Sequence, residues 1–237
     1  MHSDAQKEAF TWLSMIPALE QFPSHVVMAV LVAVLILIAG AVATLKLKAA
    51  GDSTVPDGTL TYRNFFEIVA EKLYDLTEQV MGVHAAEEYF PLCATLFIFV
   101  FGCNIIGLIP GFVPPTENIN VTLAAGVFVF LYYNFHGFRI HGIAYLKHFL
   151  GPVWYLAPLL LVVELMSHLF RPMTLALRLK GNIMGDHLVL ETFHHLVPYV
   201  VPVIFYAMGV FVSFVQAFVF CLLTMVYISL STSHDAH

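Results

Sequence analysis

Charged residues are scarce in this sequence of 237 residues: Asp, Glu, Lys and Arg make up 11% of it, and hydrophobic residues make up 59%. Soluble globular domains contain about 25% charged residues. The mean hydropathy of +0.84 is also far above the soluble range. These values exclude an ordinary soluble domain and predict an all-α polytopic membrane protein. The net charge of −6 identifies no partner, because most of the acidic residues lie in two short segments.

Cysteine is also rare. The three cysteines, Cys93, Cys103 and Cys221, lie in apolar runs, and their spacing fits neither a disulfide framework nor a zinc site. We therefore expect them to be buried side chains within membrane helices.

We do not expect the first apolar run to be a secretory signal. Residues 1–24 are mildly polar and acidic, and the apolar run that follows, Val26 to Leu45, contains 20 residues without a charge. A signal peptide has a run of only about 7–15 apolar residues, whereas about 20 residues cross the roughly 30 Å hydrocarbon core. We predict an outer N-terminal segment over 1–24 and a first span over 25–45. Lys46 and Lys48 mark the end of this span as cytoplasmic.

The segment 60–82 alternates apolar side chains with Glu67, Glu71, Lys72, Asp75 and Glu78. This pattern predicts an amphipathic helix that is too charged to cross a membrane. It should lie along the membrane surface or against a partner.

Four further helices are expected downstream, within a single transmembrane domain that occupies residues 1–237. The apolar runs 89–109 and 121–138 predict a helical hairpin around a turn with three prolines. The region 152–231 predicts a second hairpin, with helices of about 58 and 51 Å at 1.5 Å per residue. An upright span needs about 20 residues, so these two helices must be steeply tilted or bent.

Basic residues outside the spans predict the orientation. Loop 46–88 carries four Lys and Arg residues and loop 139–151 carries two, whereas the N-terminal tail carries only Lys7. By the positive-inside rule, the chain crosses five times, with its N-terminus outside and its C-terminus in the cytoplasm.

A polar stripe runs through the most unusual stretch of the chain, Glu164 to His187. At 100° per residue, seven positions share one side of a helix: Glu164, Ser167, Arg171, Thr174, Arg178, Asn182 and Gly185. Ionisable residues inside membrane helices are costly and usually mark an ion pathway.

Arg178 is the strongest single signal in this stripe, because largely apolar residues precede it back to Pro158. Its guanidinium stays charged at any accessible pH, so it acts as a fixed positive charge and cannot carry a proton. The alternatives are an arginine that extends to the membrane interface or one that pairs with Glu164.

His187, Glu191 and His194 share a helix face at i, i+4 and i+7, which also resembles metal-ligand spacing. The sequence has no HExxH motif, and titratable groups in such a row suit proton relay equally well. An intramembrane metalloenzyme and a stand-alone ion transporter therefore stand as alternatives to a subunit of a larger machine.

Three strings identify a resemblance. RPMTLALRLKGNIMGDHL at 171–188, the C-terminal FVQAFVFCLLTMVYISLSTSHDAH and NIIGLIPG at 104–111 resemble subunit a of the rotary F-type ATP synthase. The resemblance covers residues 60–237, and the first span matches only in type. It implies a non-catalytic stator subunit of a bacterial inner membrane, without cofactor, metal or nucleic acid, whose tilted hairpin faces a ring of c subunits. The implied partners are the c ring, the b subunits of the peripheral stalk and the rest of the synthase, and the translocated ion is H⁺ or Na⁺.

The resemblance also implies roles for single residues. The essential arginine of the family falls on Arg178, which would attract the c-ring carboxylate, release its proton and block direct flow between two half-channels. Gln216 corresponds to the glutamine beside that arginine, and Glu164 to the acidic residue on the cytoplasmic exit side. The remaining residues expected on the proton path are Asn104, Ser167, His168, Asn182, Asp186, His187, Glu191 and His194.

Four positions depart from the family pattern. Relatives vary between His and Glu at His187, and some carry an acid at Gly107 or a titratable residue at Gly209. Lys180 stands where an aromatic or aliphatic residue is common. The outer half-channel should therefore depend more on Asp186, Glu191 and His194.

Overall fold

The computed structural model describes residues 22–49, 62–109, 111–142 and 201–232, together with single positions between 166 and 192. Its elements in chain order are α1 (Ser24–Ala49), α2 (Tyr62–Met81), α3 (Val83–Ile106), the short 3₁₀ helix η2 (Pro115–Glu117), α4 (Ile119–His141) and α7 (Val201–Thr232). Four of these helices, α1, α3, α4 and α7, are long and apolar enough to cross a membrane. The helical fold class is thus confirmed over the described residues, with four candidate membrane spans.

The predicted outer segment over 1–24 lies almost entirely outside the described residues. The first helix of the predicted tilted hairpin is described only at single positions, so the fifth crossing stays a prediction.

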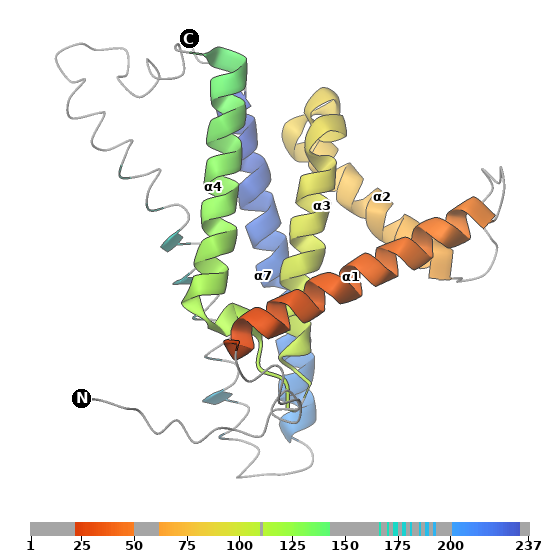
Figure 1. Cartoon of the computed structure of the whole chain (residues 1–237), viewed down its shortest axis with the longest axis vertical. Helices are drawn as coiled ribbons and strands as arrows, with labels where there is room; N and C mark the ends of the chain where they lie inside the picture. The colour runs from red at the N-terminus through yellow and green to blue at the C-terminus, as the bar shows by residue number, and fades with distance from the viewer. Residues whose placement is uncertain are drawn as a thin grey trace.

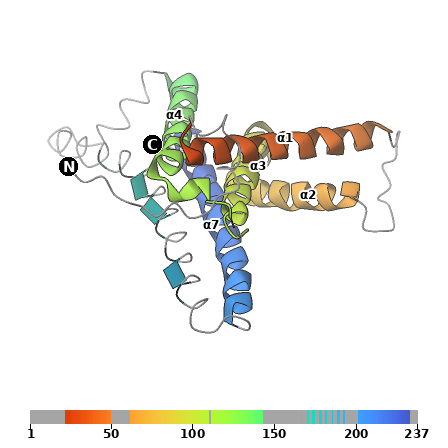
Figure 2. The same cartoon turned by 60° about the horizontal axis from the view of Figure 1, so that its bottom comes forward.

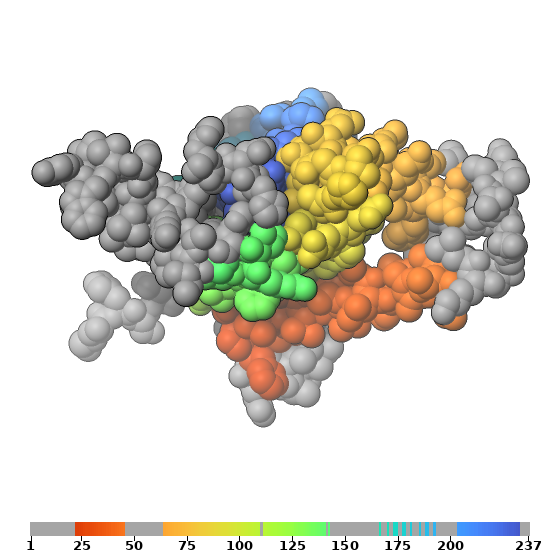
Figure 3. Space-filling view, turned by 90° about the horizontal axis from the view of Figure 1, so that it is seen from above, coloured from red at the N-terminus to blue at the C-terminus, as the bar shows by residue number. Residues whose placement is uncertain are grey.

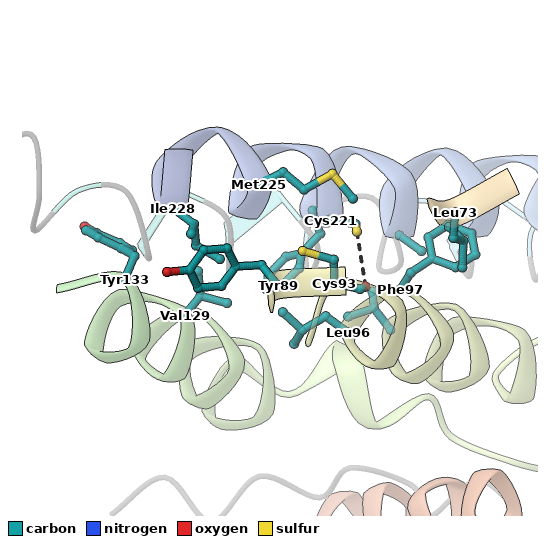
Figure 4. Close-up of a cluster of buried hydrophobic side chains, with 13 residues drawn as sticks. Leu73, Tyr89, Cys93, Leu96, Phe97, Val129, Tyr133, Cys221, Met225 and Ile228 are labelled. Carbon is teal, nitrogen blue, oxygen red and sulfur yellow. Dashed lines mark hydrogen bonds between the residues drawn. The ribbon is translucent and has the colours of Figure 1, made fainter. Parts of the chain in front are cut away.

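α7 lies between α3 and α4 and contacts both (Figure 1). A continuous apolar core forms where these helices meet, with Tyr89, Phe97, Tyr133 and Phe220 among its buried side chains (Figure 4). The thiol of Cys221 donates to the carbonyl oxygen of Cys93 at 3.2 Å across this interface. All three cysteines are buried and free, as the sequence predicts.

α1 crosses the other helices instead of running beside them, as Figures 1 and 2 both show. It lies along the outside of α3 and α4 (Figure 3) and contacts both. Met28 and Val32 are buried in this crossing, together with Cys103 and Ile106 of α3. The described helix extends beyond the predicted 25–45, because the regular backbone continues past the apolar run.

α2 forms where the amphipathic pattern predicts it and is not among the candidate spans. Leu73 is buried, and Val69, Leu76 and Val80 pack against the same core, so most of the apolar stripe meets the rest of this chain. Phe65 remains 59% exposed.

α3 begins at Val83, six residues before the predicted start at 89. Gly82 separates it from α2 with φ of +83°, a conformation that glycine adopts without steric cost. Glu87 and Glu88 lie at the end of the predicted loop 46–88, but both side chains are exposed on the first turns of the helix. Charged residues at a helix end that reaches water therefore do not terminate it.

Candidate functional site

Arg178 lies on an exposed, helical face. The described positions of this face are Met166, Phe170, Met173, Thr174, Leu177, Arg178, Gly181, Gly185, Leu188, Val189 and Thr192, all helical and all exposed. Their steps of three and four residues are those of one side of an α-helix. Arg178 is the single charged residue among these described positions.

Among the described positions, the neighbours of Arg178 on this face are apolar or small. Leu177 is 48% exposed, and Met173 one turn earlier is also 48% exposed. A Cβ atom added at Gly181 or Gly185 would meet nothing within 4 Å. The face therefore combines a permanent positive charge with open space for another helix to approach closely.

The spacing of Gly181 and Gly185 is a further sequence signal, which the motifs described above do not include. Gly181 and Gly185 stand four positions apart, which is the small-xxx-small pattern of close helix packing in membranes. The predicted polar stripe included Gly185 only for its angular position. Of that stripe, Thr174, Arg178 and Gly185 are described, and all three lie on the exposed face.

Gln216 is buried, in contrast with the exposed residues around Arg178. It is 4% exposed on α7, and Ser213 one turn earlier is 7% exposed. Gly209 is also buried, so Gly209, Ser213 and Gln216 share a buried face of α7. The predicted pairing of Gln216 with Arg178 stays a prediction.

Asn104 joins three elements at the end of α3. Its Nδ2 donates to the carbonyl oxygen of Ser213 on α7 at 3.5 Å, and its Oδ1 accepts from Thr116 Oγ1 of η2 at 2.9 Å. Asn104 is 4% exposed. These bonds connect Asn104 to α7 and η2, and its part in a proton path stays a prediction.

Two glycines permit close approach in the same region. An added Cβ would lie 2.5 Å from Cβ of Pro114 at Gly107, and 2.7 Å from Cδ2 of Leu108 at Gly209. Gly107 and Gly209, the two departures from the family pattern that lie within the described residues, are therefore positions where an added side chain fits only if its neighbour moves.

The other predicted site residues lie outside the described positions: Glu164, Ser167, His168, Asn182, Asp186, His187, Glu191 and His194. Within the described part of the chain, no group of three His, Cys, Asp or Glu side chains could hold a metal ion. The metal alternative depends on His187, Glu191 and His194, so this finding does not bear on it.

Four helices of spanning length indicate a polytopic membrane protein, and the exposed face around Arg178 leaves room for another helix. Comparison with known proteins identifies the family of this chain. The family model described as ATP synthase A chain matches residues 24–229. The chain is 43% identical over 228 residues to ATP synthase subunit a of Bdellovibrio bacteriovorus, covering 96% of this chain and 99% of the relative.

Two further relatives agree. The Geobacter sulfurreducens ATP synthase subunit a is 48% identical over 207 residues, covering 87% of this chain and 86% of the relative. That of Trichlorobacter lovleyi is 47% identical over 206 residues, covering 87% and 85%. The chain therefore belongs to the ATP synthase A chain family, the proton-translocating stator subunits of F-type ATP synthases.

Proposed function

We propose that this chain is the membrane stator of a bacterial F-type ATP synthase, and that Arg178 faces a carboxylate on the c ring. The observation that carries the proposal is the position of Arg178 on an exposed helical face whose other described members are uncharged. A charge at the centre of a membrane helix costs about 2.5–3.5 kcal/mol on insertion scales. A protein partner with a negative charge would remove most of that cost.

The proposed chemistry depends on the fixed positive charge of Arg178, which does not change with pH. Arginine remains protonated at any accessible pH, so Arg178 attracts a carboxylate only in its ionised form. As the ring turns, a protonated carboxyl group that approaches Arg178 loses its proton to the exit path. A deprotonated one that leaves Arg178 must take up a proton from the opposite side. The fixed charge also prevents protons from passing directly between the two paths.

The two glycines beside Arg178 support close contact with the ring. A partner helix can approach the backbone at Gly181 and Gly185, because neither position carries a side chain. A shorter distance strengthens the attraction between the two charges, since Coulomb energy falls with separation.

The dimensions of α1 and α7 support a tilted helix against the ring. The apolar part of α1 has 22 residues, about 33 Å at 1.5 Å per residue, which matches an upright span. α7 has 32 residues, about 48 Å. The two helices cross in Figures 1 and 2, so they cannot both stand upright. The length of α7 exceeds a hydrocarbon core of about 30 Å, so α7 should be tilted.

The proton paths extend from Arg178 to both sides. Glu164, Ser167 and His168 are assigned to the cytoplasmic exit, and Asn182, Asp186, His187, Glu191 and His194 to the outer side. Gln216 would assist Arg178, and Asn104 would hold the framework of the outer path. The N-terminus lies outside and the C-terminus in the cytoplasm, with b subunits bound on the side away from the ring.

The test is replacement of Arg178 by Ala in the intact complex, measured by ATP-driven proton pumping in membrane vesicles. Pumping should be abolished while the c ring and the soluble motor remain bound, because assembly does not require the charge. Arg139→Ala is the matched control, since Arg139 is an exposed arginine near the end of α4. Normal pumping by Arg178→Ala vesicles would refute the assigned role.

A further inference from the structure

A groove of about 530 Å³ separates the N-terminal halves of α1 and α4, and α3 forms its floor. This volume is within the roughly 300–1,000 Å³ of ligand-binding pockets. The lining is almost entirely apolar, and four alanines, Ala29, Ala33, Ala124 and Ala125, leave the space open. The groove arises because α1 crosses the helices beneath it and so separates from α4 (Figure 2).

One end of the groove is polar. His25 and Asn120 line it there, at the N-terminal ends of α1 and α4. Asn118 Oδ1 accepts from the backbone N–H of Asn120 at 2.9 Å, which orients the amide. Nδ2 of Asn118 then lies 3.2 Å from Nδ1 of His25. Because an amide nitrogen only donates, Nδ1 of His25 accepts, and the hydrogen of the neutral ring is on Nε2.

The depth of the groove matches one leaflet of a bilayer. Its lining extends from position 25 to 33 on α1 and from 120 to 128 on α4, about 12 Å along each helix. Because the two helices cross, these lengths run in different directions, and the groove is no deeper than about 12 Å along either helix. Half of a hydrocarbon core of about 30 Å is about 15 Å. A spanning helix would need contacts over both leaflets, so the dimensions favour an occupant with the length of one acyl chain.

We propose that the groove binds one acyl chain of a phospholipid, with the Nε2–H of His25 donating to an ester or phosphate oxygen of the same molecule. Both ends of the site fit this ligand: apolar walls for the chain and a hydrogen-bond donor at headgroup level. An empty groove would leave its lining without dispersion contacts. Lipid tails are as apolar as the groove, so burial alone gives no preference over bulk lipid, and the hydrogen bond from His25 supplies the retention.

The test uses the intact synthase complex in phosphatidylcholine vesicles that contain a small share of phosphatidylcholine with a diazirine on its acyl chain. After a chase with unlabelled vesicles, irradiation and mass spectrometry locate the adducts on this chain. Adducts at Ala33 and Phe99 in the groove should persist longer than adducts at Leu37, which is 72% exposed outside it. His25→Leu should shorten that persistence by roughly 3- to 20-fold, the effect of one hydrogen bond in lipid.

Ala124→Phe provides a second arm, because its ring would occupy the groove, and it should abolish the groove adducts. Leu131→Phe on the exposed side of α4 is the matched control and should leave them unchanged. Equal loss of label from the groove and from Leu37 would overturn the proposal. If Leu37 is labelled but no adducts form in the groove, a polypeptide covers the site, and this result would also overturn the proposal.

Discussion

Thr116→Val is the sharpest test of the hydrogen bonds that join the end of α3 to η2 and α7. Thr116 is 2% exposed and donates from Oγ1 to the Oδ1 of Asn104, which is itself 4% exposed. Valine has almost the same shape as threonine, so the change removes the donor without leaving a cavity. Asn104 keeps only its longer bond of 3.5 Å to the carbonyl oxygen of Ser213.

The expected loss of stability is about 1–3 kcal/mol, because a buried acceptor is left without its donor. For a chain of this size, 1 kcal/mol shifts the melting temperature by about 2–4 °C, so the shift should be about 2–12 °C. Thr95→Val is the control. Thr95 is exposed, and its Oγ1 bonds only to the Pro91 carbonyl of its own helix. We expect that change to stay within about 0.5 kcal/mol.

The assay heats the detergent-solubilised complex in steps and measures how much of this chain remains soluble and assembled. If Thr116→Val lowers the midpoint no more than Thr95→Val does, the bond between Thr116 and Asn104 contributes nothing, and the reasoning fails. If Thr116→Val lowers the stability of the chain but proton pumping is retained, the roles of Asn104 and Thr116 are structural.

Three further predictions concern packing and the proton path. Gly107→Ala should destabilise the chain by about 1–3 kcal/mol in the same heating assay, because the rigid ring of Pro114 blocks the added Cβ. Glu164→Gln should slow passive proton conduction after removal of the soluble motor, since an amide cannot relay protons; unchanged conduction would remove Glu164 from the path. Replacing His187 and Glu191 together by apolar residues should reduce proton uptake much more than either change alone; wild-type flux would leave them only a structural role.

Gly209→Ala is the control for the change at Gly107. Its added Cβ would meet the tip of the Leu108 side chain, which can rotate away, so the cost should be smaller. The backbone of Gly107 has φ of −69°, which any residue adopts, so strain does not complicate the comparison. Equal effects at both glycines would contradict the steric account.

The sequence predicted the helices well because a bilayer leaves the backbone few choices. In hydrocarbon every N–H and C=O group must bond within the chain, so a long apolar run becomes a helix. The runs around 25–45, 121–138 and 198–231 became α1, α4 and α7 with small shifts at their ends. Arg178 was predicted to be functional for a related reason, since a charge in such a run is costly and usually marks an ion pathway.

The sequence could not reveal which face of each spanning helix meets another helix. In a soluble protein the buried face is the apolar one, but lipid is as apolar as a helix interface, so α1 and α3 carry no marked apolar stripe. At 100° per residue Gly209 and Gln216 lie on one side of α7, but only the tertiary structure brought Gly209 against Leu108. The crossing of α1 and the groove beside it likewise depend on small residues distant in sequence, and only their packing decides how closely two helices approach.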